Sequence, residues 1–152
     1  MTTVAEVMTR GVRTLAPTDT VVQAAQAMDE LNVGVIPVCE GEKLVGMVTD
    51  RDIVTNVIAR ESDPRAVIVD DIMTRHPVSV WATSSVEDAL QRMQGGGVRR
   101  VPVVDERGRL VGILALDDIF EHMAARLPFA PPAVRREREP PREQSRDVGA
   151  LA

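Results

Sequence analysis

The chain has 152 residues, of which 44% are hydrophobic and 27% charged, a balance that is typical of a globular protein and excludes a disordered one. Residues 1–126 hold 13 Lys and Arg against 19 Asp and Glu, and this acidic body argues against a nucleic-acid-binding surface. The single cysteine excludes an internal disulfide, and the lack of a signal-like N-terminus or of a run of about 18 apolar residues predicts a cytoplasmic protein without membrane contact.

The first predicted helix follows the segment Pro17–Thr20, which offers helix N-cap chemistry. Apolar residues then recur at helical spacing over 21–31. Asn32 and Gly34 are expected to end this helix. The pattern next predicts strands over Val35–Cys39 and Leu44–Val48, and then a helix over Asp50–Ala59.

The same order of elements recurs 65 residues later, and a one-residue insertion in the second hairpin turn raises the offset to 66. Met8-Thr9-Arg10 corresponds to Met73-Thr74-Arg75, and Leu44-Val45-Gly46 corresponds to Leu110-Val111-Gly112. Matches in one order with a single gap indicate an internal repeat. The second copy is expected to form a helix over Ser85–Gln94, strands over Arg100–Val104 and Leu110–Leu114, and a helix over Leu116–Ala125.

The predicted fold class is α/β (α+β), with two repeats that each form a small sheet with helices on one side. Such a unit is too small to bury both of its apolar faces alone. We therefore expect the repeats to pack sheet to sheet as a pseudo-symmetric pair. We expect a first repeat over residues 4–59, a linker over 60–68 and a second repeat over 69–125. A Pro-, Arg- and Glu-rich extension of flexible composition is expected over 126–152.

Several motifs resemble those of the CBS (cystathionine-β-synthase) domain. In the first copy they are Met8-Thr9, Val35-Ile36-Pro37-Val38 and the segment Leu44–Ile53, and the second copy repeats them with Met73-Thr74, Arg99–Val104 and Leu110-Val111-Gly112-Ile113. The resemblance covers residues 4–125. It implies a Bateman module, a pair of CBS repeats that binds an adenosine-containing ligand in clefts between the repeats and commonly forms a flat homodimer. No enzyme, channel or transporter domain accompanies the repeats, so we expect a stand-alone module.

The family's ribose–phosphate motif is Gly-hydrophobic-X-Thr/Ser-X-X-Asp/Asn, and residues 46–52 match it fully. The Asp52 carboxylate would accept hydrogen bonds from two ribose hydroxyls, and the Thr49 hydroxyl would help to hold a phosphate at the start of the next helix. The resemblance further implies that Arg99 and Arg100 reach the phosphates of a ligand held by the first repeat. From spacing alone, Thr49 and Asp52 also fit a helix cap, and the arginine pair also fits a solvated strand edge.

The second copy departs from this motif. It keeps the acid as Asp118 but has Ala115 where the first copy has Thr49, and uncharged Gly34 and Val35 match the two arginines. We therefore expect one strong nucleotide site per chain, and a second cleft that binds weakly, takes a neutral nucleoside or stays empty. By analogy with the family, the apolar adenine pockets would involve Thr14, Ile36, Pro37, Val101 and Pro102.

The predicted function is a non-catalytic regulator that binds AMP, ADP or ATP and signals by conformational change to an unidentified protein target. S-adenosylmethionine or a dinucleotide remains open as the ligand, and the alternative function is a protein-interaction module without a nucleotide site. No nucleophile–base signature is found and the two histidines lack metal-ligand spacing, so neither an enzyme nor a metal site is expected. A homodimer is expected through the second helix of each repeat, with Ile53, Val57, Ile119 and Met123.

Overall fold

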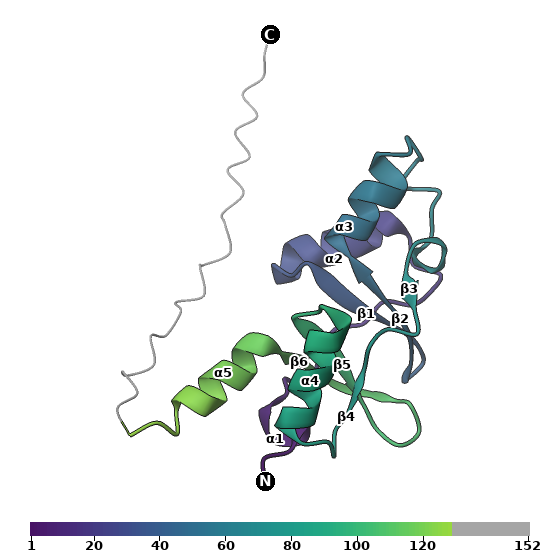
Figure 1. The fold of residues 1–152 in the computed structure, drawn as a ribbon. Helices are drawn as coiled ribbons and strands as arrows, with labels where there is room; N and C mark the ends of the chain where they lie inside the picture. Colours follow the sequence, from purple (N-terminus) through teal and green to yellow (C-terminus); the bar gives the residue numbers. More distant parts are fainter. Residues whose placement is uncertain (129–152) are drawn as a thin grey trace.

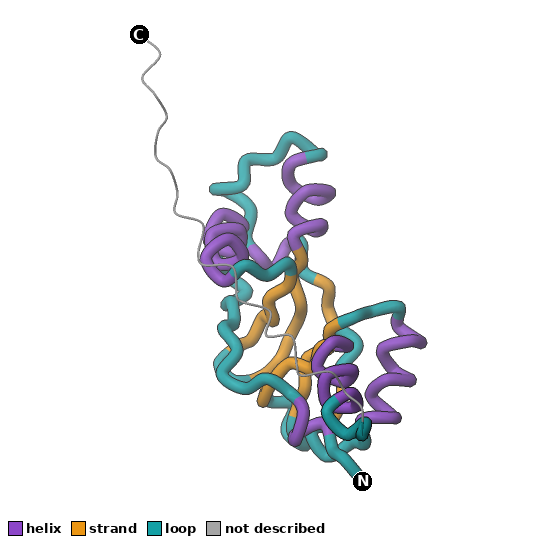
Figure 2. The backbone as a smooth tube through the Cα atoms, turned by 90° about the vertical axis from the view of Figure 1, so that its left-hand side faces the viewer, coloured by secondary structure: helices purple, strands orange, loops and turns teal. Residues whose placement is uncertain are grey.

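The computed structural model describes residues 1–128, so the expectations for the extension beyond Pro128 lie outside the described residues. Figure 1 shows two α/β units whose strands lie in the middle of the molecule, with α2 and α3 on one side and α4 on the other. Figure 2, turned by 90°, shows the same central strands with helices on their outer sides. The predicted fold class and the sheet-to-sheet arrangement are thus confirmed. Within residues 1–128, no helix is long and apolar enough to cross a membrane.

The first repeat begins its helical layer with α2 (Val21–Leu31), as predicted. The Thr20 hydroxyl caps this helix by accepting the Gln23 backbone N–H at 3.2 Å, and Asn32 ends it in the left-handed conformation with φ of 53°. The helix buries one apolar face against the hairpin of β1 (Val35–Glu40) and β2 (Lys43–Thr49). These two strands pair antiparallel, so the local pattern located all three elements correctly.

The helix predicted over 50–59 forms with two different geometries. α3 (Asp50–Ile53) is a regular helix, and the chain continues directly as a π-helix, Val54–Ile58. The Thr55 hydroxyl donates to the Arg51 carbonyl oxygen at 2.8 Å within this segment. Such side-chain bonds compete with the main-chain ladder of a helix, and they accompany the change of geometry here.

The second repeat follows the prediction closely, with α4 (Val86–Gly96), β5 (Arg100–Val104), β6 (Leu110–Ala115) and α5 (Leu116–Ala124). The helix α4 runs two residues beyond the predicted end because Gly95 and Gly96 remain helical. Gly97, with φ of 63°, is the residue that ends it. Glycine adopts this left-handed conformation at little cost in free energy because it has no side chain.

The opening segment of each repeat crosses to the other repeat, a feature that the sequence did not predict. Val4, in α1 (Val4–Val7), is fully buried in the core of the second repeat. Val69, in the 3₁₀ helix Val69–Asp71, is fully buried in the core of the first repeat. The following strand β3 (Thr74–Arg75) then adds to the edge of β2. The two repeats are therefore interlocked by exchanged segments.

The two sheets have the strand orders β1-β2-β3 and β4-β5-β6, where β4 (Val80–Trp81) pairs parallel with β5. The hairpin turns of the two repeats also meet, because the Leu110 N–H donates to the Glu42 carbonyl at 2.9 Å. Gly46 and Gly112 lie where the crossing segments pass over the hairpins. A Cβ atom at either glycine would lie under 3.0 Å from a methionine sulfur of the crossing segment.

The burial of the second helices corrects one expectation about the predicted dimer surface. Val57 and Ile119 are completely buried within the chain, so they are unavailable to a second copy. The neighbouring Val54, Ile58 and Phe120 are each more than half exposed, as is Met123 from the predicted set. The helical spacing identified an apolar face correctly, but the packing of each helix on its own sheet decided which of its residues remain outside.

Candidate functional site

A cavity of about 810 Å³ lies between the two repeats, at the ends of the strands where β2 passes into α3 and β6 passes into α5. Its volume falls in the range of roughly 300–1,000 Å³ that is usual for small-molecule sites. Residues from both repeats line it. The cavity is thus lined by both apolar and charged side chains, which a single ligand can contact at the same time.

Much of the cavity lining is apolar. Its apolar side chains include Pro77, Val78, Val98, Pro102 and Leu116 of the second repeat and Val35 and Met47 of the first. Of these, only Pro102 was among the predicted site residues. Pro77 and Val78 follow the crossing strand β3, so their position depends on a long-range pairing that no local pattern reveals. These side chains offer hydrophobic surface of the kind that holds an aromatic base.

The lining also contains Thr49 and five charged side chains, which are Asp50, Arg51, Arg99, Arg100 and Asp117. All five charged residues are exposed. No ion pair within 4.0 Å joins any of them to a partner in residues 1–128, whereas Arg13, Arg75 and Arg109 are each paired with a carboxylate. The guanidinium groups at the cavity are therefore available to an anionic ligand.

Thr49 and Asp52 form a reciprocal cap at the start of α3. The Thr49 N–H donates to Asp52 Oδ2 at 2.9 Å, and the Asp52 N–H donates to Thr49 Oγ1 at 3.0 Å. The helix-cap alternative is therefore present in the structure. Thr49 also lines the cavity, whereas Asp52 is half-buried behind it and is absent from the lining. Its Oδ1 atom accepts no hydrogen bond from residues 1–128, so one oxygen remains for a ligand hydroxyl.

The structure does not separate the two sets of residues that the sequence assigned to two clefts. Ala115, Gly34 and Val35, expected at the weaker cleft, line the same cavity as Thr49 and the arginine pair. The reason is that the strands of both repeats end at one edge of the interface. Asp118 resembles Asp52, because it is half-buried and its Oδ2 accepts the Ala115 N–H at 3.1 Å.

The remaining predicted residues lie elsewhere. Thr14 lines a different cavity of about 440 Å³ near the hairpin turns, next to Cys39. Ile36, Pro37 and Val101 are buried and do not line the cavity between the strand ends. Burial raises the pKa of the Cys39 thiol, so this group stays protonated and unreactive at neutral pH.

The order of elements, repeated twice along the chain, agrees with the family comparison. A model of the CBS domain matches residues 4–59 and again residues 69–125. The chain belongs to the CBS-domain family. Its relatives therefore indicate which ligands a CBS pair of this kind accommodates.

Hypoxic response protein 1 of Mycobacterium tuberculosis is 38% identical to this CBS pair over 124 residues, 81% of this chain and 86% of that protein. The crystal structure of Hypoxic Response Protein I, with two coordinated zinc ions, has a TM-score of 0.74 and covers 80% of this chain and 98% of its own. Within residues 1–128 of the present protein, no group of three His, Cys, Asp or Glu side chains is placed to hold a metal ion.

Two other solved CBS pairs contain adenosine derivatives. CBSX2 of Arabidopsis thaliana, in complex with AMP, is 28% identical with a TM-score of 0.72, and the match covers 82% of this chain and 98% of that one. The CBS pair of MJ0100, in complex with 5′-methylthioadenosine and S-adenosyl-L-methionine, is 25% identical with a TM-score of 0.72, covering 84% and 99%. Ligand-binding regulatory modules thus occur among proteins of this fold and sequence.

Proposed function

We propose that this CBS pair is a non-catalytic, cytoplasmic regulator that binds an adenine nucleotide in the cavity between its repeats. The single observation that carries the proposal is a lining that combines apolar side chains with three arginines that have no ion-pair partner within residues 1–128. A nucleotide has the same combination, with a flat base at one end and phosphates at the other.

In this proposal the adenine ring lies against Pro77, Val78 and Val98 of the second repeat. The phosphates point toward Thr49, Arg99 and Arg100. The remaining carboxylate oxygen of Asp52, Oδ1, accepts a hydrogen bond from the ribose hydroxyls. The arginines matter because the described chain is acidic overall, and an anion needs local cations to offset the surrounding negative field.

Regulation follows from the position of the site. A ligand that contacts both repeats at once favours the arrangement of repeats in which both sets of contacts are made. The exchanged segments link each repeat to the core of the other, so a change in their relative position would reach both helical faces. A protein target that binds one of these faces would sense the nucleotide.

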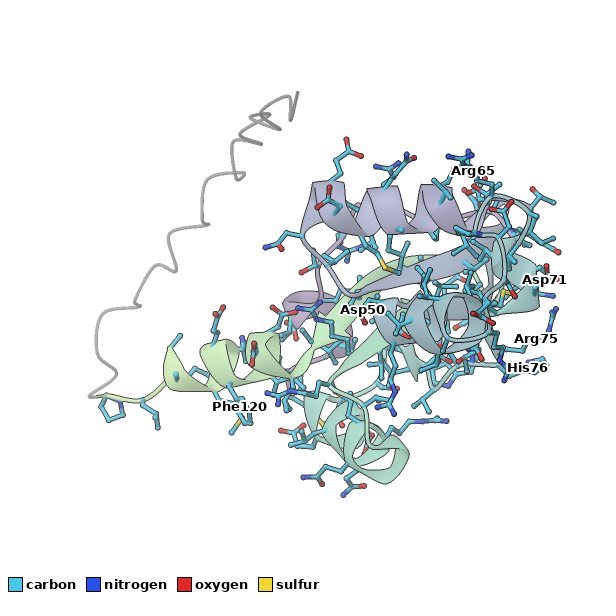
Figure 3. The ribbon with its side chains drawn as sticks, turned by 90° about the horizontal axis from the view of Figure 1, so that it is seen from above. Asp50, Arg65, Asp71, Arg75, His76 and Phe120 are labelled. Carbon is cyan, nitrogen blue, oxygen red and sulfur yellow. The ribbon has the colours of Figure 1, made fainter. Side chains whose placement is uncertain are left out.

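We also propose a homodimer formed through the exposed apolar side chains of the second helices, Val54, Ile58, Phe120 and Met123. Figure 3 shows Phe120 projecting from α5 away from the body of the molecule. Exposed apolar residues gathered on two helices are typical of an interaction surface and not of a monomer's solvent face.

The decisive experiment is titration calorimetry with AMP, ADP, ATP and adenosine, together with thermal unfolding at each ligand concentration. A ligand of the native state raises the melting temperature by mass action. We expect saturable binding of at least one nucleotide at about one per chain. If none of the four compounds binds or stabilises the protein at millimolar concentration, the alternative of an interaction module without a nucleotide site replaces this proposal.

A further inference from the structure

Two short connections join the repeats at equivalent places. The first, residues 10–14, follows Thr9, which exchanges two main-chain hydrogen bonds with Ile113 of β6 at 2.8 and 2.9 Å. It ends at Leu15, whose N–H donates to a carbonyl oxygen of β1 at 2.9 Å. The second, residues 76–79, runs from β3, which pairs with β2, to β4, which pairs with β5. Each connection is thus anchored on one repeat at its start and on the other repeat at its end, and neither is helix or strand.

Both connections contain a residue in the left-handed region near their start. Gly11 has φ of 69°, and His76, which lies 65 positions later and is equivalent to it, has φ of 48°. Glycine adopts this conformation at little cost, whereas a residue with a side chain is disfavoured there. His76 also precedes Pro77, whose ring favours extended backbone in the residue before it. The same turn is thus relaxed in the first connection and strained in the second.

Strain of this kind persists only where the surrounding structure enforces it. The other non-glycine residues with positive φ within residues 1–128 have a local role, because Asn32 ends α2 and Glu61 lies in the turn after the π-helix. His76 instead lies between the paired strands β3 and β4, whose positions on different repeats fix the direction of the chain between them. The strain at His76 therefore belongs to the junction of the repeats.

The strained connection is the one that reaches the cavity between the strand ends. Pro77 and Val78 line this cavity, whereas His76 is exposed and does not line it. Figure 3 shows His76 at the edge of the molecule. Val78 packs closely on α4, because a Cβ atom at Gly96 would lie 3.0 Å from its Cγ2 atom. The relaxed connection lines the smaller cavity near the hairpin turns instead.

We propose that His76 is a positioning residue whose strained backbone acts as a hinge for the cavity lining. While His76 is left-handed, Pro77 and Val78 lie in the lining. When His76 returns to negative φ, the connection changes direction and withdraws them. A ligand that contacts Pro77 and Val78 binds the left-handed state better and so increases its population. This inference rests on the proposed function, because an adenine nucleotide serves as its probe.

Substitution of His76 in the full chain changes the strain without removing a side chain from the cavity. His76→Gly removes the cost of the left-handed state, and His76→Val raises it, because a β-branched residue is poorly compatible with positive φ. In calorimetry with ATP we expect His76→Gly to tighten binding about threefold and His76→Val to weaken it about threefold. His76→Asn should bind at least as tightly as the wild type, because asparagine tolerates left-handed backbone.

Gly11→Ala is the matched control. It introduces a side chain at the equivalent left-handed position of the connection that does not reach this cavity. A Cβ atom at Gly11 meets nothing within 4 Å, so backbone strain is the only effect expected of it. This variant should unfold at a lower urea concentration than the wild type and bind ATP with unchanged affinity.

Trp81 reports the state of the hinge even without a ligand. It is the single tryptophan of the chain, lies in β4 directly after the second connection and is 46% exposed. Its fluorescence emission should differ between ligand-free His76→Gly and His76→Val, whereas Gly11→Ala should match the wild type. ATP should move the wild-type emission toward that of His76→Gly.

The outcomes separate the hinge from the proposed function. Equal ATP affinity in the wild type, His76→Gly and His76→Val would overturn the hinge while leaving nucleotide binding intact. A Gly11→Ala variant that loses as much affinity as His76→Val would overturn it as well, because general destabilisation would then explain both. Absence of ATP binding would overturn the proposed function, and identical Trp81 emission in the ligand-free variants would then overturn the hinge too. Thermal unfolding verifies that each variant is folded, and His76→Gly decides alone if His76→Val is not.

Discussion

Thr49 and Asp52 hold each other at the start of α3, each accepting the other's backbone N–H through its side chain at 3.0 and 2.9 Å. In the second repeat only half of this arrangement exists. Asp118 accepts the Ala115 N–H at 3.1 Å, but Ala115 has no oxygen to return the bond. Thr49 thus both caps a helix and lines the cavity, whereas Asp52 completes the cap from behind the lining.

This difference predicts opposite effects of two substitutions on stability. Thr49→Ala should lower the free energy of unfolding by about 1 kcal/mol, since it removes an N-cap oxygen. Ala115→Thr should raise it by about 0.5–1 kcal/mol, because the new hydroxyl can accept the Asp118 N–H. Urea unfolding followed by circular dichroism measures both. Destabilisation by Ala115→Thr would show that the β6–α5 junction has no room for the hydroxyl.

The arginines in the cavity lining predict a selective loss of phosphate recognition. Arg99→Ala and Arg100→Ala should weaken ATP binding far more than adenosine binding, because adenosine presents no charge to them. Calorimetry with both ligands at low and high salt measures the effect, and the loss should shrink at high salt through screening. Arg92→Ala, an exposed arginine on α4 outside the cavity lining, is the control. Equal losses for adenosine and ATP would mean that the arginines only shape the cavity.

The exchanged segments predict that two glycines are indispensable. A Cβ atom at Gly112 would lie 2.7 Å from the Thr9 carbonyl oxygen, and one at Gly46 would lie 3.0 Å from that of Thr74. Both alanine substitutions should destabilise the protein by about 1–3 kcal/mol, as overpacking does, and Gly112→Ala should have the larger effect. Urea unfolding again provides the measurement.

Gly95→Ala is the matched control for this pair. A Cβ atom at Gly95 meets nothing within 4 Å, and the residue lies within helix α4. This variant should therefore gain about 0.5–1 kcal/mol, the usual advantage of alanine over glycine inside a helix. A loss for Gly95→Ala as large as that for Gly112→Ala would argue against close packing of the exchanged segments as the cause.

The proposed dimer surface predicts that a charge on either second helix separates the subunits. Ile58→Glu and Phe120→Glu should each convert a dimer into a monomer, since a carboxylate would be buried without a partner. Sedimentation velocity at micromolar concentration distinguishes the two states. Leu31→Glu, at an exposed apolar residue at the end of α2, should leave the dimer intact. A monomeric wild-type protein would contradict the prediction.

The sequence by itself determined the repeat, the two hairpins and most of the helices. Caps such as Thr20 and left-handed stops such as Asn32 act within a few residues, so their effect is readable from local order. The resemblance to the CBS family also pointed to Thr49 and the arginine pair, which line the cavity. All of these features depend on residues that are close together along the chain.

Only the tertiary structure decided how the two copies share their cores and their cavity. Val4 and Val69 are each buried in the core of the other repeat. This exchange brings Pro77 and Val78 to the cavity between the repeats. The same packing buried Val57 and Ile119 and left Ile58 and Phe120 outside. Such placements arise from contacts between residues that are distant in sequence, whose energies depend on the shape of the assembled core and leave no periodic signal in the chain.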